Sequence, residues 1–297
     1  MAMTPQLPPE LYLLIIEFIT DSNDLSCIWL NFRRVSREFK AITESVFVRK
    51  HLAHTRIEFP AITRRVYDKD DNEHWRELIL HFETLTGING ERAVFSQKRE
   101  EYHASTRILL GYSNSDDEDN NTLYKHVTTL WRECFYGYSL PAPKTAFATP
   151  PHVLSVRRVV NDTALPGLEV NWEEHTISVL WKEMLTALFG EEEYLKQVEA
   201  NEIREYYEKE GGFEALAERI RAGDREALRF MTLASGTDMK RRRMVRKKRF
   251  RRWYENHTDL DVEEQPDNPG KVKILRDYQV GMNLVIFDDE SGNNSDE

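Results

Sequence analysis

Residues 7–46 read LPPELYLLIIEFITDSNDLSCIWLNFRRVSREFKAITESV, and this stretch decides the fold expected for the first part of the chain. Pro8 and Pro9 suit the first turn of a helix, because the N–H group that proline lacks has no helical partner there. The residues that follow, 10–20, are apolar almost throughout. We therefore expect a helix over residues 10–20 that is buried around most of its circumference.

Two further helices are predicted by the spacing of the next apolar residues. Asp24 can cap a helix, because its side-chain oxygen can accept a hydrogen bond from a free backbone N–H group. Apolar side chains then recur at helical spacing, at Leu25, Ile28, Trp29, Phe32, Val35, Phe39, Ile42 and Val46. This stripe predicts two amphipathic helices with a bend or break near residues 33–36. Three short helices form only a small core, which we expect to lean on the rest of the chain.

Helical and strand periods are mixed in the middle of the chain. Residues 55–59 alternate between polar and apolar side chains, which predicts a strand, and residues 93–95 predict another. Residues 71–86 have apolar side chains at helical spacing and are followed by Gly87, which predicts a helix. A helix capped by Thr122 is predicted to bury Val127, Trp131, Cys134 and Phe135.

Strands and then helices are predicted for the following part. Residues 152–160 and 168–172 read as two strands, and Pro166-Gly167 between them indicates a turn or hairpin. An amphipathic helix over residues 178–189 is expected to end at Gly190. Charged helices are expected over residues 191–210, 213–221 and 224–234. No repeat with a period of 20–50 residues is present, which argues against solenoid and propeller folds.

The composition excludes several classes of protein. The longest apolar run, residues 11–16, is far shorter than the roughly 20 residues that span a membrane. No basic segment precedes it, so it does not resemble a secretion signal. Cys27 and Cys134 are too few for a disulfide framework or a thiolate metal site. We expect an intracellular protein, in the nucleus, the cytoplasm or both.

The net charge of −10 is unevenly distributed along the 297 residues. Residues 240–252 contain ten Lys/Arg and no acid, whereas residues 255–297 have a formal charge of −9, which leaves −11 for residues 1–239. Residues 1–60 hold seven acids and seven bases, so this part is neutral. An acidic body, a basic block and an acidic tail form an organised pattern.

The first module resembles a known family in the order of its motifs. Leu7-Pro8 precedes a Leu/Ile-rich helix, Asp24-Leu25 follows, and Val35-Ser36-Arg37 comes shortly before the aromatic Phe39. This arrangement resembles the F-box, and the sequence of residues 33–47, RRVSREFKAITESVF, is similar to F-box-like modules of fungal proteins. The resemblance covers roughly 45 of the 297 residues. The gap from Leu25 to Val35 is about one helical turn longer than in the usual F-box, which predicts a longer second helix.

The resemblance implies a binding module and not an enzyme. F-boxes dock on the Skp-type adaptor of a cullin–RING (SCF) ubiquitin ligase, while the rest of the chain recruits a protein substrate. Carried over by position, the residues in or beside that apolar interface are Leu7, Pro8, Leu11, Ile15, Val35 and Phe39. The alternative is that these side chains pack on the chain's own C-terminal part.

The basic block has three interpretations. Its cations are Lys240, Arg241, Arg242, Arg243, Arg246, Lys247, Lys248, Arg249, Arg251 and Arg252. Clustered Lys and Arg are typical of a nuclear localisation signal. They also suit contact with nucleic-acid phosphates, with Phe250, Trp253 and Tyr254 available for stacking. The third interpretation is a solvated helix that faces the acidic parts of the same chain.

The tail carries a short apolar run followed by acids. Leu284, Val285, Ile286 and Phe287 precede Asp288-Asp289-Glu290, which resembles a SUMO-interacting motif. Such motifs add a strand to the edge of a partner's sheet. The alternative is that residues 272–275 and 284–287 are two strands of the fold.

Motifs that would indicate catalysis are incomplete. His51 and His54 are spaced for one helical face, but no nearby acid or thiol completes a metal set. The acidic loop at residues 116–119 lacks the glycine and terminal glutamate of an EF-hand. There is no nucleophile elbow. We expect no catalysis, no cofactor and no metal.

These observations predict a mainly helical α+β protein in four parts: an F-box-like three-helix module at 1–50, an α+β substrate-recruiting domain with a few short strands at 51–238, a basic segment at 239–254, and an acidic, partly disordered tail at 255–297. The expected function is recruitment of a protein substrate to an SCF-type ligase through a Skp-type adaptor. The alternatives are a nuclear, nucleic-acid-associated protein that acts through residues 240–253 and an enzyme of unrecognised fold. Nucleic acid is the less favoured partner, and no membrane is expected.

Overall fold

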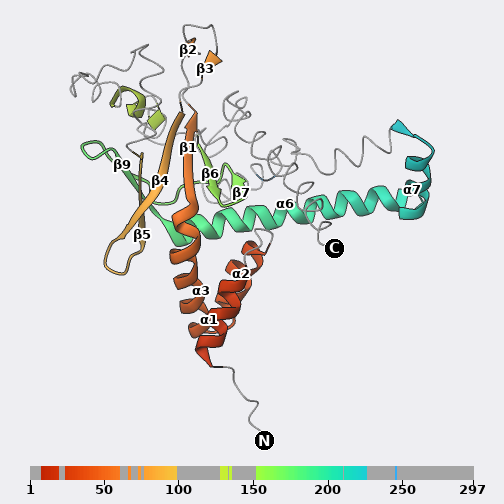
Figure 1. Ribbon diagram of the computed structural model, residues 1–297, viewed down its shortest axis with the longest axis horizontal. Helices are drawn as coiled ribbons and strands as arrows, with labels where there is room; N and C mark the ends of the chain where they lie inside the picture. The colour runs from red at the N-terminus through yellow and green to blue at the C-terminus, as the bar shows by residue number, and fades with distance from the viewer. Residues whose placement is uncertain are drawn as a thin grey trace, which may run out of the picture.

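The fold combines N-terminal helices, an antiparallel sheet and one long helix (Figure 1). It is seen in a computed structural model that describes residues 8–19, 24–60, 66–67, 73–74, 77–98, 128–132, 134–135, 152–209, 211–225 and 245. The expectation of a mixed α+β fold is confirmed. The expectation of a few short strands understates the sheet, because seven strands join in one antiparallel sheet.

The N-terminal helices lie close to the ranges that the apolar spacing predicts, but the second is not the longer helix expected, because it ends at Asn31 and residues 32–34 form a 3-10 turn. In order they are α1 (Pro9–Phe18), α2 (Leu25–Asn31), the 3-10 turn η1 (Phe32–Arg34), α3 (Arg37–Val46), the π-helical η2 (Phe47–His51) and the 3-10 turn η3 (Leu52–His54). The Ser36 hydroxyl caps α3 by accepting a hydrogen bond from the backbone N–H of Phe39 at 3.1 Å. The predicted break near residues 33–36 is therefore confirmed.

The main sheet brings distant strands together. Its spatial order is β7 (Val159–Asn161), β6 (Val153–Val156), β1 (Thr55–Pro60), β4 (Glu77–Thr86), β5 (Arg92–Ser96), β9 (Thr176–Leu180) and β8 (Glu169–Asn171). The register places Ile57 opposite Leu80 on one side and Leu154 on the other, and all three are buried. β2 (Val66–Tyr67) and β3 (Glu73–His74) form a separate pair. The strands predicted at 55–59, 93–95 and 168–172 are confirmed as β1, β5 and β8.

The helix predicted over residues 71–86 is wrong, because its described part forms β3 and β4. The sequence of β4, ELILHFETLT, fits either period when taken alone. In the structure Leu78 and Leu80 are fully buried, whereas Ile79 and His81 on the opposite face are partly exposed. Pairing with β1 and β5 therefore selects the period of two over the helical period.

Three predicted boundaries after residue 150 are also wrong. Residues 152–160 contain two strands, β6 and β7, joined by a turn at Arg157, which has a φ of 54°. β8 pairs with β9 and not with these strands. The helix predicted from residue 178 starts only at residue 181, because residues 178–180 belong to β9. As α6 (Trp181–Lys209) it continues through Gly190, the residue at which an end was predicted. A glycine inside a helix costs only about 1 kcal/mol relative to alanine, which the burial of the helix's apolar face outweighs.

The remaining helical predictions are only partly described. The helix after Thr122 is helical at residues 128–132 and 134–135, with Trp131, Cys134 and Phe135 buried as expected. The helix at 213–221 is confirmed as α7 (Phe213–Arg221). Most of residues 224–234 lies outside the described residues. Among the helices that the structure describes, none combines the length and apolar character needed to cross a membrane.

One hydrophobic core joins the N-terminal helices to the sheet and α6. Trp29 of α2 is completely buried, and its ring centroid lies 4.7 Å from that of Phe47 and 5.8 Å from that of Trp181. Its indole N–H donates a hydrogen bond to the Thr186 hydroxyl at 3.0 Å. The small core of the first helices is thus completed by packing against α6, as expected for helices too short to form a stable core alone.

Candidate functional site: an apolar face on α1

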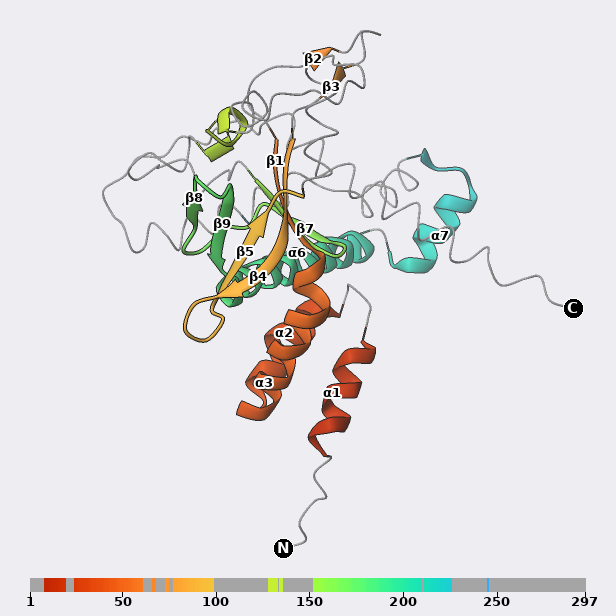
Figure 2. The same cartoon turned by 60° about the vertical axis from the view of Figure 1, so that its left-hand side comes forward.

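α1 presents a row of apolar side chains to solvent. Leu11, Leu14, Ile15 and Phe18 are 41%, 45%, 48% and 79% exposed. They stand at i, i+3, i+4 and i+7, the spacing of one helix face. We call these four residues the α1 stripe. In Figure 2 α1 lies beside α3, at the end of the molecule away from the sheet.

The other side of α1 anchors the helix. Ile16 is buried in the core, and the ring centroid of Tyr12 lies 4.3 Å from that of Phe39 on α3. At the end of α1, the Lys50 ammonium donates a hydrogen bond to the Glu17 carbonyl at 2.9 Å, and Arg49 pairs with the Glu17 carboxylate at 2.8 Å. The expectation that most of this helix's circumference is buried is therefore wrong, because only one side packs on the protein.

The residues that the F-box resemblance singles out have different environments. Leu11 and Ile15 belong to the α1 stripe, Pro8 is exposed just before α1, and Val35 is 63% exposed at the end of η1. Phe39 is partly buried, because it packs against the rings of Tyr12 and Phe32. Leu7 lies outside the described residues, as do all ten cations of the basic block and residues 284–287.

Leu14 and Phe18 are the residues that the sequence interpretation missed. Their positions relative to Leu11 repeat the spacing of a helix face, so the signal was present in the sequence. It was not decisive because apolar side chains surround α1 except on the side of Glu10 and Glu17, and nothing local shows which apolar side packs on the protein.

An ion-pair network fixes the supporting helices to α6. The Glu44 carboxylate on α3 lies 2.7 Å from both the Arg33 guanidinium and the Lys182 ammonium. Burial alone would raise the pKa of Glu44, but hydrogen bonds from Lys182 and Arg33 hold it below the ordinary value. Arg33 also stacks over the Trp29 ring at 4.1 Å. The network therefore holds α3 and α2 in place beneath α1.

A second polar contact joins the helices to the sheet. The guanidinium of Arg157, in the β6–β7 turn, donates a hydrogen bond from Nε to Nδ1 of His51 at 2.9 Å. Burial, followed by the positive charge of Arg157, lowers the pKa of His51 to about 4. His51 is buried while His54 is exposed, so the structure does not bring these two histidines together as a pair of ligands. Within the described ranges no three His, Cys, Asp or Glu side chains are grouped to hold a metal.

Comparison with protein-family models, curated proteins and solved structures finds no match to the chain.

Proposed function

We propose that the chain docks on the Skp-type adaptor of an SCF ubiquitin ligase through the α1 stripe and recruits a protein substrate with another surface. The observation that carries this proposal is the exposure of Leu11, Leu14, Ile15 and Phe18 along one face of α1. Recognition of a helix in an apolar groove uses anchors at this spacing. The Leu-Pro and Val-Ser-Arg motifs on either side support the F-box interpretation.

The energetics require a surface larger than the stripe. Burying a half-exposed apolar side chain contributes about 1 kcal/mol. Four such side chains contribute about 4 kcal/mol, which offsets only the low end of an association cost of about 4–15 kcal/mol. Val35, which is also exposed, is the next apolar contact that the resemblance assigns. Residues 1–60 have no net formal charge, so the docking depends on apolar contact and should be insensitive to salt.

The test is co-purification of the full chain with a Skp-type adaptor. The double variant Leu11→Ala/Ile15→Ala should bind the adaptor about tenfold more weakly or worse, because both substitutions remove central interface anchors. Ile88→Ala is the matched control, because Ile88 is 94% exposed in the turn between β4 and β5. A wild-type chain that does not bind the adaptor at micromolar concentrations contradicts the proposal.

The second candidate is nucleic-acid association through the basic block, which the ten cations of residues 240–252 favour. It predicts binding to generic DNA or RNA that weakens steeply with salt. Neutralising the cations between Arg246 and Arg252 should then abolish that binding, while adaptor binding stays unchanged.

A further inference from the structure

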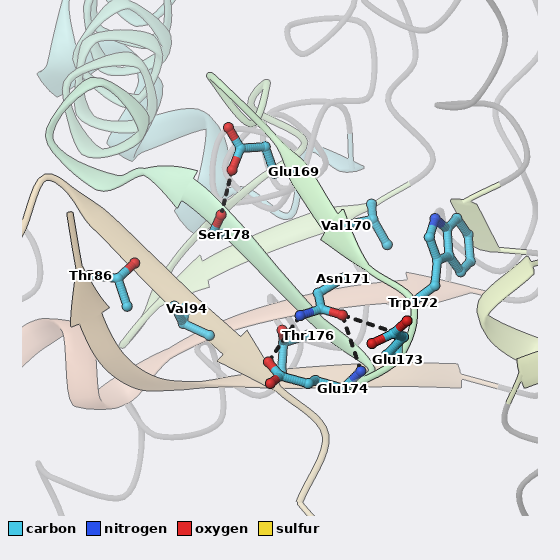
Figure 3. A pocket seen from close by; sticks show the side chains of 10 residues that line it. All are labelled: Thr86, Val94, Glu169, Val170, Asn171, Trp172, Glu173, Glu174, Thr176 and Ser178. Carbon is cyan, nitrogen blue, oxygen red and sulfur yellow. Dashed lines mark hydrogen bonds between the residues drawn. The ribbon is translucent and has the colours of Figure 1, made fainter.

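The polar face of the sheet is hollowed where it ends at β8 and β9 (Figure 3). The hollow has a volume of about 560 Å³ and is open to solvent. Its floor contains Val94 of β5 and Ser178 of β9, which stand opposite each other in the register. Their neighbours Phe95 and Ile177 point to the opposite face and are buried. The hollow therefore lies on the outer face of the sheet and not in the core.

The walls of this hollow are acidic. Glu169, Glu173 and Glu174 line it, and among the residues that the structure describes no cationic side chain does. The Asn171 amide oxygen accepts hydrogen bonds from the backbone N–H groups of Glu173 and Glu174, and its Nδ2 donates to the Glu174 carboxylate at 3.0 Å. These bonds fix the turn that presents the two carboxylates.

The nearby positive groups do not cancel this charge. Arg92 pairs with Glu169 at 3.1 Å and also donates to the Ser178 hydroxyl at 3.0 Å. Within the described part of the chain, one cation therefore lies beside three carboxylates. His175 follows in the same turn, and burial lowers its pKa, which disfavours the charged imidazolium there. The turn over residues 172–175 therefore carries two negative charges.

An open strand edge borders the hollow. β8 is the last strand in the order of the main sheet, and among the described strands it pairs only with β9. The edge of such a strand offers N–H and C=O groups to an extended chain. Trp172, which is 39% exposed, stands at the end of β8 and adds an apolar surface.

We propose that the hollow and the β8 edge together bind an extended, basic segment of a partner protein. The segment adds a strand beside β8, and its Lys or Arg side chains pair with Glu173 and Glu174. That this segment belongs to the recruited substrate rests on the proposed function, whereas the binding of a basic peptide at this site does not depend on it. In Figure 2 β8 and β9 lie at one side of the molecule, away from α1, so both partners could bind the chain at once.

The test uses the full chain and a fluorescein-labelled decapeptide of alternating lysine and threonine, with binding followed by fluorescence anisotropy. The wild-type chain should bind the peptide. Glu173→Gln with Glu174→Gln should raise its Kd about tenfold. Glu205→Gln with Glu208→Gln, on the exposed surface of α6, is the control with the same change in charge and should alter the Kd less than about twofold. Methylating alternate backbone nitrogens of the peptide should also weaken binding, because it removes the strand hydrogen bonds.

Three results would overturn the proposal. One is no binding by the wild-type chain, and another is an equal loss in both double variants, which would show nonspecific attraction to an acidic protein. The third is peptide binding that appears only after the ten cations of residues 240–252 are replaced, because the chain's own basic block would then occupy the hollow. Adaptor binding plays no part in the assay, so its failure and the failure of the adaptor proposal are distinguishable.

Discussion

α1 and α2 are both short, apolar helices, yet they have opposite surroundings. α2 lies against α6 and buries Leu25, Ile28 and Trp29 almost completely. α1 packs mainly on α3 and leaves Leu14 and Phe18 in contact with solvent. Apolar content therefore favours burial of both helices, but α2 buries its apolar face within the described chain, whereas α1 packs on α3 with one side only. The difference assigns α2 to the stability of the fold and leaves one apolar side of α1 open to solvent, which is the surface that the proposed docking uses.

The largest expected effect is on the α2 side of this comparison. Trp29→Ala removes a fully buried ring and the hydrogen bond to Thr186. It should lower the free energy of unfolding by about 3–5 kcal/mol, measured by urea denaturation. Trp29→Phe should recover part of that loss, because it restores ring contacts but not the hydrogen bond. A loss below about 1 kcal/mol for Trp29→Ala would contradict the role of α2 as the anchor.

The next effect is the pH dependence of the joint between the helices and the sheet. His51 has a folded pKa of about 4, against about 6.5 in an unfolded chain. Between pH 4 and pH 6.5 the unfolded state binds more protons at this imidazole than the folded state. The contribution of neutral His51 to the free energy of unfolding is therefore fully present above pH 6.5 and is lost as the pH falls toward 4. The loss is on the order of 3 kcal/mol. Urea midpoints across this range should fall less in His51→Gln, and parallel curves for the two proteins would contradict the assignment.

A smaller effect is expected at the contact between α3 and α6. Glu44→Gln removes the carboxylate that pairs with Arg33 and Lys182. It should lower the free energy of unfolding by about 1–2 kcal/mol. The loss is no larger because Lys182 is partly exposed and solvent weakens its pair with Glu44. Glu208→Gln, on the exposed surface of α6, should change the unfolding free energy by less than about 0.5 kcal/mol. Equal effects of the two changes would show that the network does not hold the helices.

The smallest expected effect on stability is on the α1 stripe itself. Leu14→Ala with Phe18→Ala should change the unfolding free energy by less than about 1 kcal/mol, because both side chains already contact water. Circular dichroism and urea titration provide the measurement. A loss as large as that of Trp29→Ala would mean that the stripe is packed within the chain, and the contrast between the two helices would disappear.

The sequence predicts the elements that local chemistry specifies. Ser36 caps α3 by a bond to a residue three positions away, and the apolar stripe of α2 is visible in its spacing. β4 could not be predicted, because its strand form depends on β1 and β5, which are its neighbours only in the folded sheet. The same limit applies to α6, which passes Gly190 because distant residues bury its apolar face.

The candidate docking surface was predictable only in part. The F-box resemblance singles out Leu11 and Ile15, and both lie on the exposed stripe. It also singles out Phe39, which packs against Tyr12 within the protein. The division into inner and outer sides depends on how α1 meets α3, and that contact is tertiary. The acidic hollow is not visible in the sequence, because Thr86, Val94 and Glu169 come from three separate strands.

The most direct test of the central claim is a calorimetric titration of a purified Skp-type adaptor into the 297-residue chain. The wild-type chain and Ile88→Ala should bind with micromolar or tighter affinity, and the double variant Leu14→Ala/Phe18→Ala should have a Kd at least about tenfold higher. The absence of binding by the wild-type chain, or equal affinities for all three proteins, would contradict the claim.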